Sequence, residues 1–461
     1  MRLILLLLSL FISSCADKHE KKPNTTINTE VASTTAGPSV FLSGLACQTD
    51  PSIHYSVYFP GRFNNSTLFP VLILFDPHAD GNLPINLYKE LADRYNFILL
   101  GSNDSRNGNS AEQTAGILQA LSAQARILDK ADTNLIFAGG FSGGARVAAM
   151  LALSPAGIKG LVVCGAGLPQ GSWTGIPPNV IVGIAGNSDM NLIEITNFKI
   201  SDPGLASRFQ VVRFNGSHAW PPVMQFEQAF IAFSCIAQRD KMTSSNDTLL
   251  KFAEDRMKSY IMSSDDPIYK AEAYKRWIMN LGGLADINGV SSKLKQLITS
   301  PNYLNAVSYE KSLGQTESFK RNELMQALGS RDTLWWKDQM KSWLDTSSFI
   351  TDHSRIAMIH RVQGTISLTV YMSLNRAVAA TSLEQGLYFS TIYRLVDPLN
   401  PESWYLSAVV AAQGGRLGQC REYLESAIKN GFQDIERCRK EVAFAPLQSD
   451  AQFQSLINSI H

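Results

Sequence analysis

The sequence predicts an α/β region with a doubly wound, mostly parallel sheet over residues 41–239, followed by an all-α region over residues 240–461. Short apolar runs such as residues 71–75 alternate with helical patterns in the first region, and continuous apolar runs are typical of strands buried on both faces of a parallel sheet. Beyond residue 240 the strand patterns stop and helical periodicity continues. A chain of 461 residues also exceeds the size that one hydrophobic core usually supports, so more than one domain is expected.

The elements of the first region alternate in a β-α order. Strands are predicted at residues 55–59, 71–75, 97–100, 134–138, 158–163, 180–185 and 209–214, and helices at 84–95, 111–128, 145–153 and 224–236. This order favours right-handed crossovers between parallel strands. In such a sheet the carboxyl ends of the strands meet at one edge, where ligands bind.

The second region contains helical patterns with lysine- and glutamate-bearing faces. Helices are predicted at residues 249–262, 268–281, 292–297, 317–328, 333–344, 354–371, 383–395, 401–413 and 418–430. A polar stretch at residues 239–247, rich in Ser, Thr and Asn, precedes them. We therefore expect the boundary between the two domains near residue 240.

The last two predicted helices carry a repeat-like spacing of small and large side chains. Its members are Trp404, Ala408, Gly415, Cys420, Leu424 and Ala427. This spacing resembles a tetratricopeptide repeat over about residues 401–434, in which small residues let two antiparallel helices approach closely. Ser407, Ala411 and Phe432 depart from the usual pattern. The resemblance implies a helical-repeat surface that could take a protein partner, since such repeats need neighbours to bury their faces.

The charge balance gives no sign of a nucleic-acid partner. A formal net charge of +1 supplies no electrostatic attraction for polyanions. Motifs for a metal, a nucleotide or an organic cofactor are absent from the sequence, so no cofactor is expected. His353 and His360 have no acidic or cysteine partners at ligand spacing.

The N-terminus has the pattern of an export signal. Residues 3–12 form an apolar run that is too short to span a bilayer but suits the core of a signal peptide. The run leads into two serines and Cys15, which resembles a bacterial lipobox. We expect residues 1–15 to be a lipoprotein signal and residues 16–40 a disordered tether. The alternative is an ordinary signal peptide. A lipid on Cys15 would anchor the protein in the cell envelope, in the periplasm or on the outer-membrane surface.

The remaining cysteines allow disulfides in an oxidising compartment. Cys47 and Cys235 fall at the two ends of the first domain and could form a bridge. Cys420 and Cys438 could pair across a helical hairpin. Cys164 lies in an apolar strand and is expected in the core.

One Gly-x-Ser-x-Gly run, residues 140–144, has Ser142 at its centre. It follows the predicted strand 134–138 and precedes the predicted helix 145–153. A sharp strand-to-helix turn leaves little room for side chains beside the serine and presents its Oγ at the carboxyl end of the sheet. Ser142 is therefore a candidate nucleophile. A glycine turn without chemistry, or a phosphate-binding loop, is the alternative.

Residues 41–236 resemble the α/β-hydrolase superfamily, close to its small dienelactone-hydrolase-like and esterase-like members. In this superfamily the nucleophile, the acid and the histidine occur in that order after successive strands. Here Asp189 and His218 each follow a predicted strand and match the acid and the base. The resemblance thus implies a triad of Ser142, Asp189 and His218, with Asp202 as the reserve acid.

The same resemblance implies an oxyanion hole made of two backbone N–H groups. Gly143, directly after the nucleophile, is the expected first donor. The second should come from the loop after the strand 71–75. Pro77 has no N–H, so His78 or Ala79 is expected to donate, with His78 the preferred residue. His78 could alternatively present its side chain to the substrate.

The sequence therefore predicts a membrane-anchored serine hydrolase that works through an acyl-enzyme on Ser142. The expected substrate is a small-molecule or polymer-attached carboxylic ester. Two alternatives stay open: a serine peptidase of the same fold, because peptide cleavage uses the same groups, and a non-catalytic lipoprotein scaffold that binds partners through residues 240–461.

Overall fold

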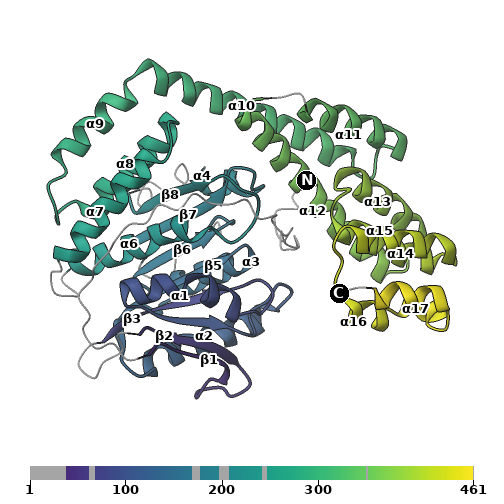
Figure 1. Cartoon of the computed structure of the whole chain (residues 1–461), viewed down its shortest axis with the longest axis horizontal. Coiled ribbons are helices and arrows are strands. Elements are labelled where there is room, and N and C mark those ends of the chain that lie inside the picture. Colours follow the sequence, from purple (N-terminus) through teal and green to yellow (C-terminus); the bar gives the residue numbers. More distant parts are fainter. Residues whose placement is uncertain are drawn as a thin grey trace. The chain divides into compact units, whose positions relative to one another are not determined.

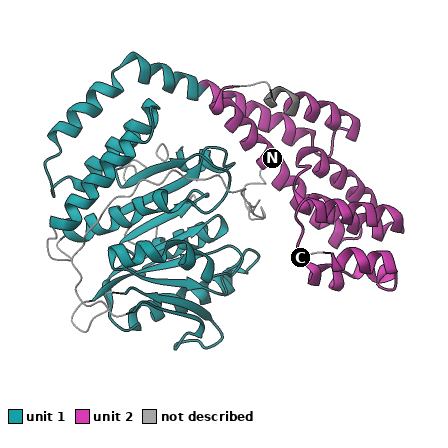
Figure 2. Ribbon diagram, viewed as in Figure 1, with its two compact units in different colours: residues 1–10, 21–311 teal, residues 11–20, 312–461 magenta. Residues whose placement is uncertain are grey.

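The computed structural model describes residues 38–61, 68–168, 177–196, 207–240, 247–348 and 351–459 (Figure 1). The predicted signal peptide with Cys15, most of the predicted tether, and Asp202 lie outside these ranges. The chain divides into two compact units: of the described residues, those up to 311 belong to unit 1 and those from 312 onward to unit 2 (Figure 2). The division falls within a single helix.

Unit 1 contains an eight-stranded sheet in the order β1-β2-β4-β3-β5-β6-β7-β8. Its strands are β1 (Val40–Ala46), β2 (His54–Phe59), β3 (Phe69–Phe75), β4 (Ile98–Ser102), β5 (Ala131–Phe141), β6 (Gly160–Cys164), β7 (Val180–Gly186) and β8 (Phe209–Phe214). β1 and β2 are antiparallel to their neighbours, and the pairs from β4 to β8 are all parallel. The predicted doubly wound, mostly parallel sheet is confirmed. β1 was not predicted, because this edge strand is exposed along nearly its whole length.

Helices cover both faces of the sheet. Alternate side chains of β3 enter the two core clusters: Val71, Ile73 and Phe75 face one way, and Leu72 and Leu74 the other. The first face carries α2 (Ala111–Ile127), α3 (Gly143–Leu153) and α4 (Leu192–Thr196), and the second carries α1 (Asn82–Tyr95) and α6 (Val223–Arg239). Both faces are therefore buried, which explains why the strand sequences are almost purely apolar.

Unit 1 continues past the predicted boundary at residue 240. α6 is buried at every position from 225 to 238, and a helix that is buried all round needs cover on its second side. The following helices α7 (Asp247–Met262) and α8 (Pro267–Leu281) contribute Met257 and Trp277 to the same core cluster. α9 (Asn288–Ile298) packs on α8. The change of composition near residue 240 thus marks the end of the sheet, while the division between units lies at residues 311 and 312.

Unit 2 is helical, as predicted. Its elements are the end of α10 (Pro301–Ala327), then α11 (Thr333–Ser348), α12 (His353–Ala379), α13 (Leu383–Val396), α14 (Pro401–Gln413), α15 (Leu417–Lys429), α16 (Ile435–Lys440), the 3-10 helix η2 (Val442–Leu447) and α17 (Ala451–Asn458). α14 and α15 form the predicted hairpin, with Ala408, Leu424 and Ala427 buried between helices. Gly415, at the turn, has φ of 70°, which glycine adopts without strain. The tetratricopeptide assignment stays a prediction.

The five cysteines among the described residues are free thiols, so neither of the two possible disulfides is formed in the structure. Cys47 belongs to the core cluster on one face of the sheet and Cys235 to the cluster on the other. Cys420 and Cys438 are buried in the core of unit 2, where burial raises the pKa of each thiol to about 12. Cys164 lies in the core, as predicted.

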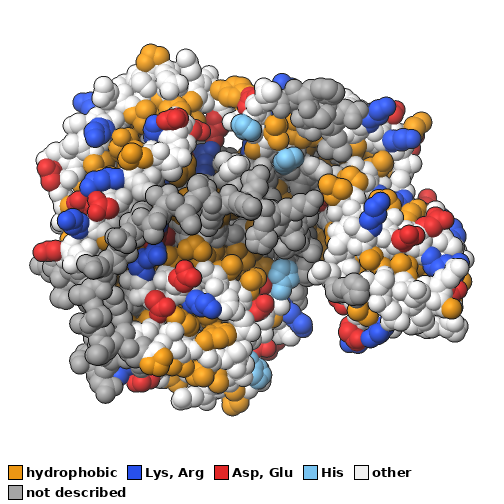
Figure 3. All heavy atoms as spheres, in the orientation of Figure 1, with side chains coloured by type: hydrophobic (Ala, Val, Ile, Leu, Met, Phe, Trp, Pro, Cys, Tyr) orange, Lys and Arg blue, Asp and Glu red, His pale blue; other side chains and the backbone are white. Residues whose placement is uncertain are grey.

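Within the described ranges, the structure contains no helix that is both long and apolar enough to cross a membrane. On the face drawn in Figure 3, basic and acidic side chains of the described residues are interspersed. This distribution agrees with the near-zero formal charge.

Candidate active site

Ser142 sits at a sharp turn between β5 and α3. Its backbone has φ of 53° and ψ of −120°, a conformation that non-glycine residues rarely adopt and that is strained. Its N–H donates to the carbonyl of Cys164 on the neighbouring strand at 2.8 Å. A side chain at Gly140 would collide with the backbone of Gly144, and one at Gly144 with the carbonyl of Phe75. The two flanking glycines are therefore required by close backbone approach.

The structure brings the three predicted residues together. His218 Nε2 lies 2.9 Å from Ser142 Oγ, and His218 Nδ1 lies 2.9 Å from Asp189 Oδ1. With Nδ1 protonated, the imidazole donates to the aspartate and accepts the serine O–H through Nε2. Asp189 is fully buried, and its Oδ1 also accepts the N–H of Asn191 at 2.8 Å. This is the hydrogen-bonded order of a serine nucleophile, its base and the group that orients the base.

The topology explains why these side chains meet. β5, β6, β7 and β8 are adjacent and parallel, so their carboxyl ends lie along one edge of the sheet. Ser142 follows β5, Asp189 follows β7 and His218 follows β8. A nucleophile elbow in a sheet of this order is diagnostic. The chain has the α/β-hydrolase fold.

Gly165, after β6, is a part of this site that the sequence did not reveal. It has φ of 61°. A Cβ at this position would lie 2.8 Å from the ring of Phe141, 3.0 Å from Asp189 Oδ2 and 3.0 Å from His218 Cε1. The Gly165 carbonyl accepts the side-chain N–H of Asn191 at 2.8 Å. Residue 165 therefore borders both the acid and the base. In the sequence, the position of Gly165 is marked only by a glycine directly after a strand. That pattern is too common to identify a site residue.

The loop after β3 holds the two expected oxyanion donors in hydrogen bonds of its own. The N–H of His78 donates to Oδ1 of Asp76 at 2.8 Å, and the His78 ring Nδ1 lies 3.2 Å from the same oxygen. The N–H of Ala79, the second predicted donor, is bonded to the carbonyl of Ser105 at 3.1 Å. Aspartate commonly accepts the amide two residues ahead, and the Asp76-Pro77-His78 order makes this turn. The expected oxyanion donors of this loop are thus engaged elsewhere.

Asp76 also connects this loop to the histidine loop. Its buried carboxylate accepts the indole N–H of Trp220 at 2.8 Å through Oδ2. Trp220 follows His218 by two residues, and its ring lies 5.5 Å from that of Phe141. The Phe141 ring in turn lies 4.7 Å from the imidazole of His218. This bond joins residues that are 144 positions apart in the sequence, so local patterns could not predict it.

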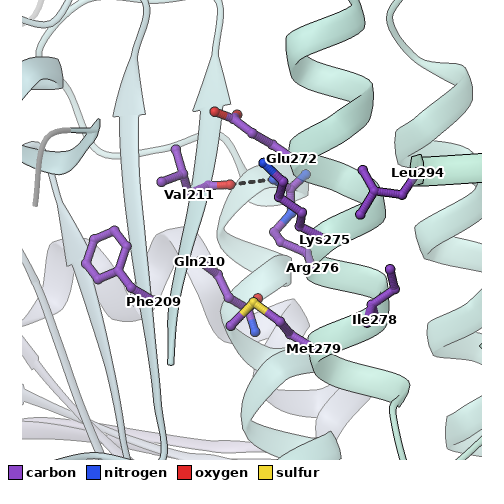
Figure 4. Close-up of a pocket in the computed structure, with 9 residues that line it drawn as sticks. All are labelled: Phe209, Gln210, Val211, Glu272, Lys275, Arg276, Ile278, Met279 and Leu294. Atoms are coloured by element: carbon purple, nitrogen blue, oxygen red, sulfur yellow. Dashed lines mark hydrogen bonds between the residues drawn. The ribbon is translucent and has the colours of Figure 1, made fainter. Parts of the chain in front are cut away.

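A hollow of about 230 Å³ lies elsewhere in unit 1, between β8 and helices α8 and α9 (Figure 4). It is lined at its strand side by Phe209, Gln210 and Val211, from the amino end of β8. His218 follows the opposite end of that strand, so this hollow is separate from the Ser142 site. Arg276 on α8 also lines it and donates to the carbonyl of Val211, as the dashed line in Figure 4 shows.

Metal ligands are not grouped in the described part of the chain: no three His, Cys, Asp or Glu side chains there are placed to hold one ion.

Comparison with known proteins finds similar solved structures. One is an S-formylglutathione hydrolase from Staphylococcus aureus, with 12% identity and a TM-score of 0.35 over 43% of this chain and 98% of that chain. A thermostable carboxylesterase from a metagenomic library has 12% identity and a TM-score of 0.32 over 45% and 92%. A dienelactone-hydrolase-like phosphotriesterase, also from metagenomic libraries, has 12% identity and a TM-score of 0.32. The match covers 48% of this chain and 96% of that chain. Nothing about activity follows from matches this distant. No family model and no curated protein matches the sequence.

Proposed function

We propose that unit 1 is a serine hydrolase that cleaves carboxylic esters through an acyl-enzyme on Ser142. The observation that carries this proposal is the continuous chain of hydrogen bonds from Ser142 Oγ through His218 to the buried Asp189, with 2.9 Å at each step. A serine hydroxyl is a weak nucleophile until a base takes its proton. The strained turn at Ser142 supports a catalytic purpose, since such strain is typical of functional sites.

The reaction follows from these groups. Ser142 Oγ attacks the ester carbonyl carbon while His218 Nε2 takes the hydroxyl proton, and Asp189 stabilises the imidazolium. The carbonyl oxygen becomes an oxyanion, to which the N–H of Gly143 is directed as the first residue of α3. When the tetrahedral intermediate collapses, His218 gives its proton to the departing alcohol. Water then attacks the acyl-enzyme with His218 as base, and the acid is released while Ser142 regains its proton.

Esters are the proposed substrates because an alkoxide leaving group needs less help than an amine. In the described site, His218 is the group that protonates the leaving group. A peptidase would use the same group, so the two activities are separated by their substrates. A panel of p-nitrophenyl esters of increasing acyl length, beside peptide p-nitroanilides, distinguishes the two activities. Ester turnover without anilide turnover is the expected result.

The nucleophile is tested with a fluorophosphonate probe, which labels activated serines covalently. We expect the wild type to be labelled and Ser142→Ala to lose both labelling and ester turnover. Ser43→Ala is the matched control, because Ser43 lies on the exposed edge strand β1 and bonds Asn82. Equal labelling of wild type and Ser142→Ala, or no labelling of the wild type, refutes the proposal.

The lipid anchor belongs to the same proposal and rests on the apolar run 3–12 and Cys15. Acylation of Cys15 would keep the enzyme at the cell-envelope membrane and leave residues 16–40 as a tether. Expression in a bacterium with an alkyne-tagged fatty acid tests it. The wild type should become labelled and sediment with membranes, whereas Cys15→Ala should do neither. Membrane sedimentation of Cys15→Ala contradicts the anchor.

We propose that unit 2 binds a protein partner through its helices. The support is the α14–α15 hairpin, whose sequence resembles a helical repeat. Affinity capture with the full chain, compared between wild type and a variant with charge-reversed exposed residues of this hairpin, tests the idea. Identical captured proteins from both would contradict it.

A further inference from the structure

A tetrahedral oxyanion is stabilised best by two hydrogen-bond donors, and the structure leaves the second donor of this site unassigned. Gly143 supplies one N–H. In the loop after β3, Pro77 has no N–H, the His78 N–H donates to Asp76, and the Ala79 N–H donates to Ser105. The two backbone N–H groups expected to provide the second donor therefore already have acceptors within the protein.

The neighbouring loop, after β4, brings another donor to the same place. β4 pairs with β3 and β3 pairs with β5, all parallel, so the loops after these strands emerge side by side. The N–H of Asn107 donates to the carbonyl of Pro77 at 2.9 Å, and Arg106 forms a β-bridge with His78. These contacts hold Asn107 against the loop after β3, whose two expected donors are already engaged.

The side chain of Asn107 lies against Gly143. A Cβ built on Gly143 would overlap Asn107 Oδ1 and lie 3.2 Å from Asn107 Nδ2. The carboxamide therefore occupies the space that a side chain at the residue after the nucleophile would fill. This contact explains why position 143 is glycine although its own φ is in the helical range rather than the left-handed region.

The Nδ2 group of Asn107 is buried and has no hydrogen-bond partner among the described residues. Buried polar groups are almost always paired, and an unpaired one in a native structure calls for an explanation. A donor held ready for charge that develops only during the reaction is such an explanation, because it remains unpaired until the oxyanion forms.

We propose that the side-chain amide of Asn107 is the second oxyanion donor of this enzyme, beside the backbone N–H of Gly143. The inference rests on the proposed serine hydrolase function and deepens it. A side chain on the loop after β4 takes the place of the backbone amide that the loop after β3 would otherwise supply. Asn107 touches the reacting oxygen and is a catalytic residue in this sense.

The proposal is tested with Asn107→Ala in the full chain, after fluorophosphonate labelling has established that the wild type is a serine hydrolase. Loss of one oxyanion donor lowers kcat by about 100- to 1,000-fold in comparable sites. We expect that loss for a p-nitrophenyl ester, with KM changed by less than about threefold, because the donor acts in the transition state. Asn109→Ala is the matched loop control, since its Oδ1 supports the Arg106 N–H, and it should retain activity within about threefold of the wild type.

Two further measurements separate a catalytic role from a structural one. A trifluoromethyl ketone forms a tetrahedral adduct with an oxyanion, so its inhibition constant should rise in parallel with the loss of kcat. Gly143→Ala keeps its backbone N–H but displaces the carboxamide of Asn107, so it should show the same kcat defect. The double variant should then be no slower than Asn107→Ala alone.

The outcomes are distinct. A wild type that the probe does not label defeats the proposed function itself. A labelled, active wild type whose Asn107→Ala variant keeps its kcat overturns the inference alone. An unchanged inhibition constant for the ketone, or additive losses in the double variant, also overturns it.

Discussion

Replacing Gly165 by alanine is expected to disable the site while leaving the fold intact. The residue has φ of 61°, and an L-residue in the left-handed region costs roughly 1–2 kcal/mol. The new methyl group would also lie 2.8 Å from Phe141 and 3.0 Å from both Asp189 Oδ2 and His218 Cε1. Contacts this short force neighbours to move, at about 1–3 kcal/mol for an overpacked core. Together we expect a loss of about 2–5 kcal/mol in the free energy of unfolding.

The same methyl group should displace the imidazole from Ser142. The 2.9 Å contacts on both ring nitrogens leave His218 little freedom to shift without losing one of them. A misplacement of about 1 Å in a catalytic constellation lowers the rate by roughly 100-fold. We therefore expect kcat/KM of Gly165→Ala for a p-nitrophenyl ester to fall by about that factor, and fluorophosphonate labelling to slow in parallel.

Gly157→Ala is the matched control. Gly157 has φ of 69°, and its nearest neighbour would be the Arg126 guanidinium at 4.0 Å. It shares the backbone strain without the contacts to the site. Thermal unfolding and ester kinetics of both variants then separate strain from crowding. If Gly165→Ala has the kcat/KM of Gly157→Ala, the reasoning from the Cβ contacts is refuted.

Three other predictions concern single groups. Asp189→Asn should keep KM but lower kcat by about 10⁴-fold, because an amide favours the wrong tautomer of the histidine; steady-state kinetics that show a loss below tenfold would contradict the triad. Glu227→Gln should lower the free energy of unfolding in urea by about 1–3 kcal/mol, since this buried carboxylate pairs with two partly exposed arginines; an unchanged urea midpoint would contradict it. Burial raises the pKa of Cys420 and Cys438 to about 12, so both thiols stay protonated at pH 8 and should react with iodoacetamide only after unfolding; rapid alkylation of the native chain would contradict their placement in the core.

The sequence by itself determined the features that depend on local pattern and order. Apolar runs of strand length alternating with helices specify a parallel sheet, and a parallel sheet places the residues after its strands at one edge. Ser142, Asp189 and His218 could therefore be chosen from their positions after strands, and the structure joins them by hydrogen bonds. The α14–α15 hairpin could also be predicted from the sequence, because small residues repeat at helical spacing on its inner face.

Only the tertiary structure decided which surfaces and loops meet. Helical periodicity after residue 240 is the same whether a helix covers α6 or starts a new domain, so the division at residues 311 and 312 was not readable. The bond between Asp76 and Trp220 and the contact of Asn107 with Gly143 join loops that follow different strands. Sequence patterns indicate which side chains of each helix or strand are buried. The order of the strands in the folded sheet decides which loops lie together, and so which groups a loop amide or a glycine contacts.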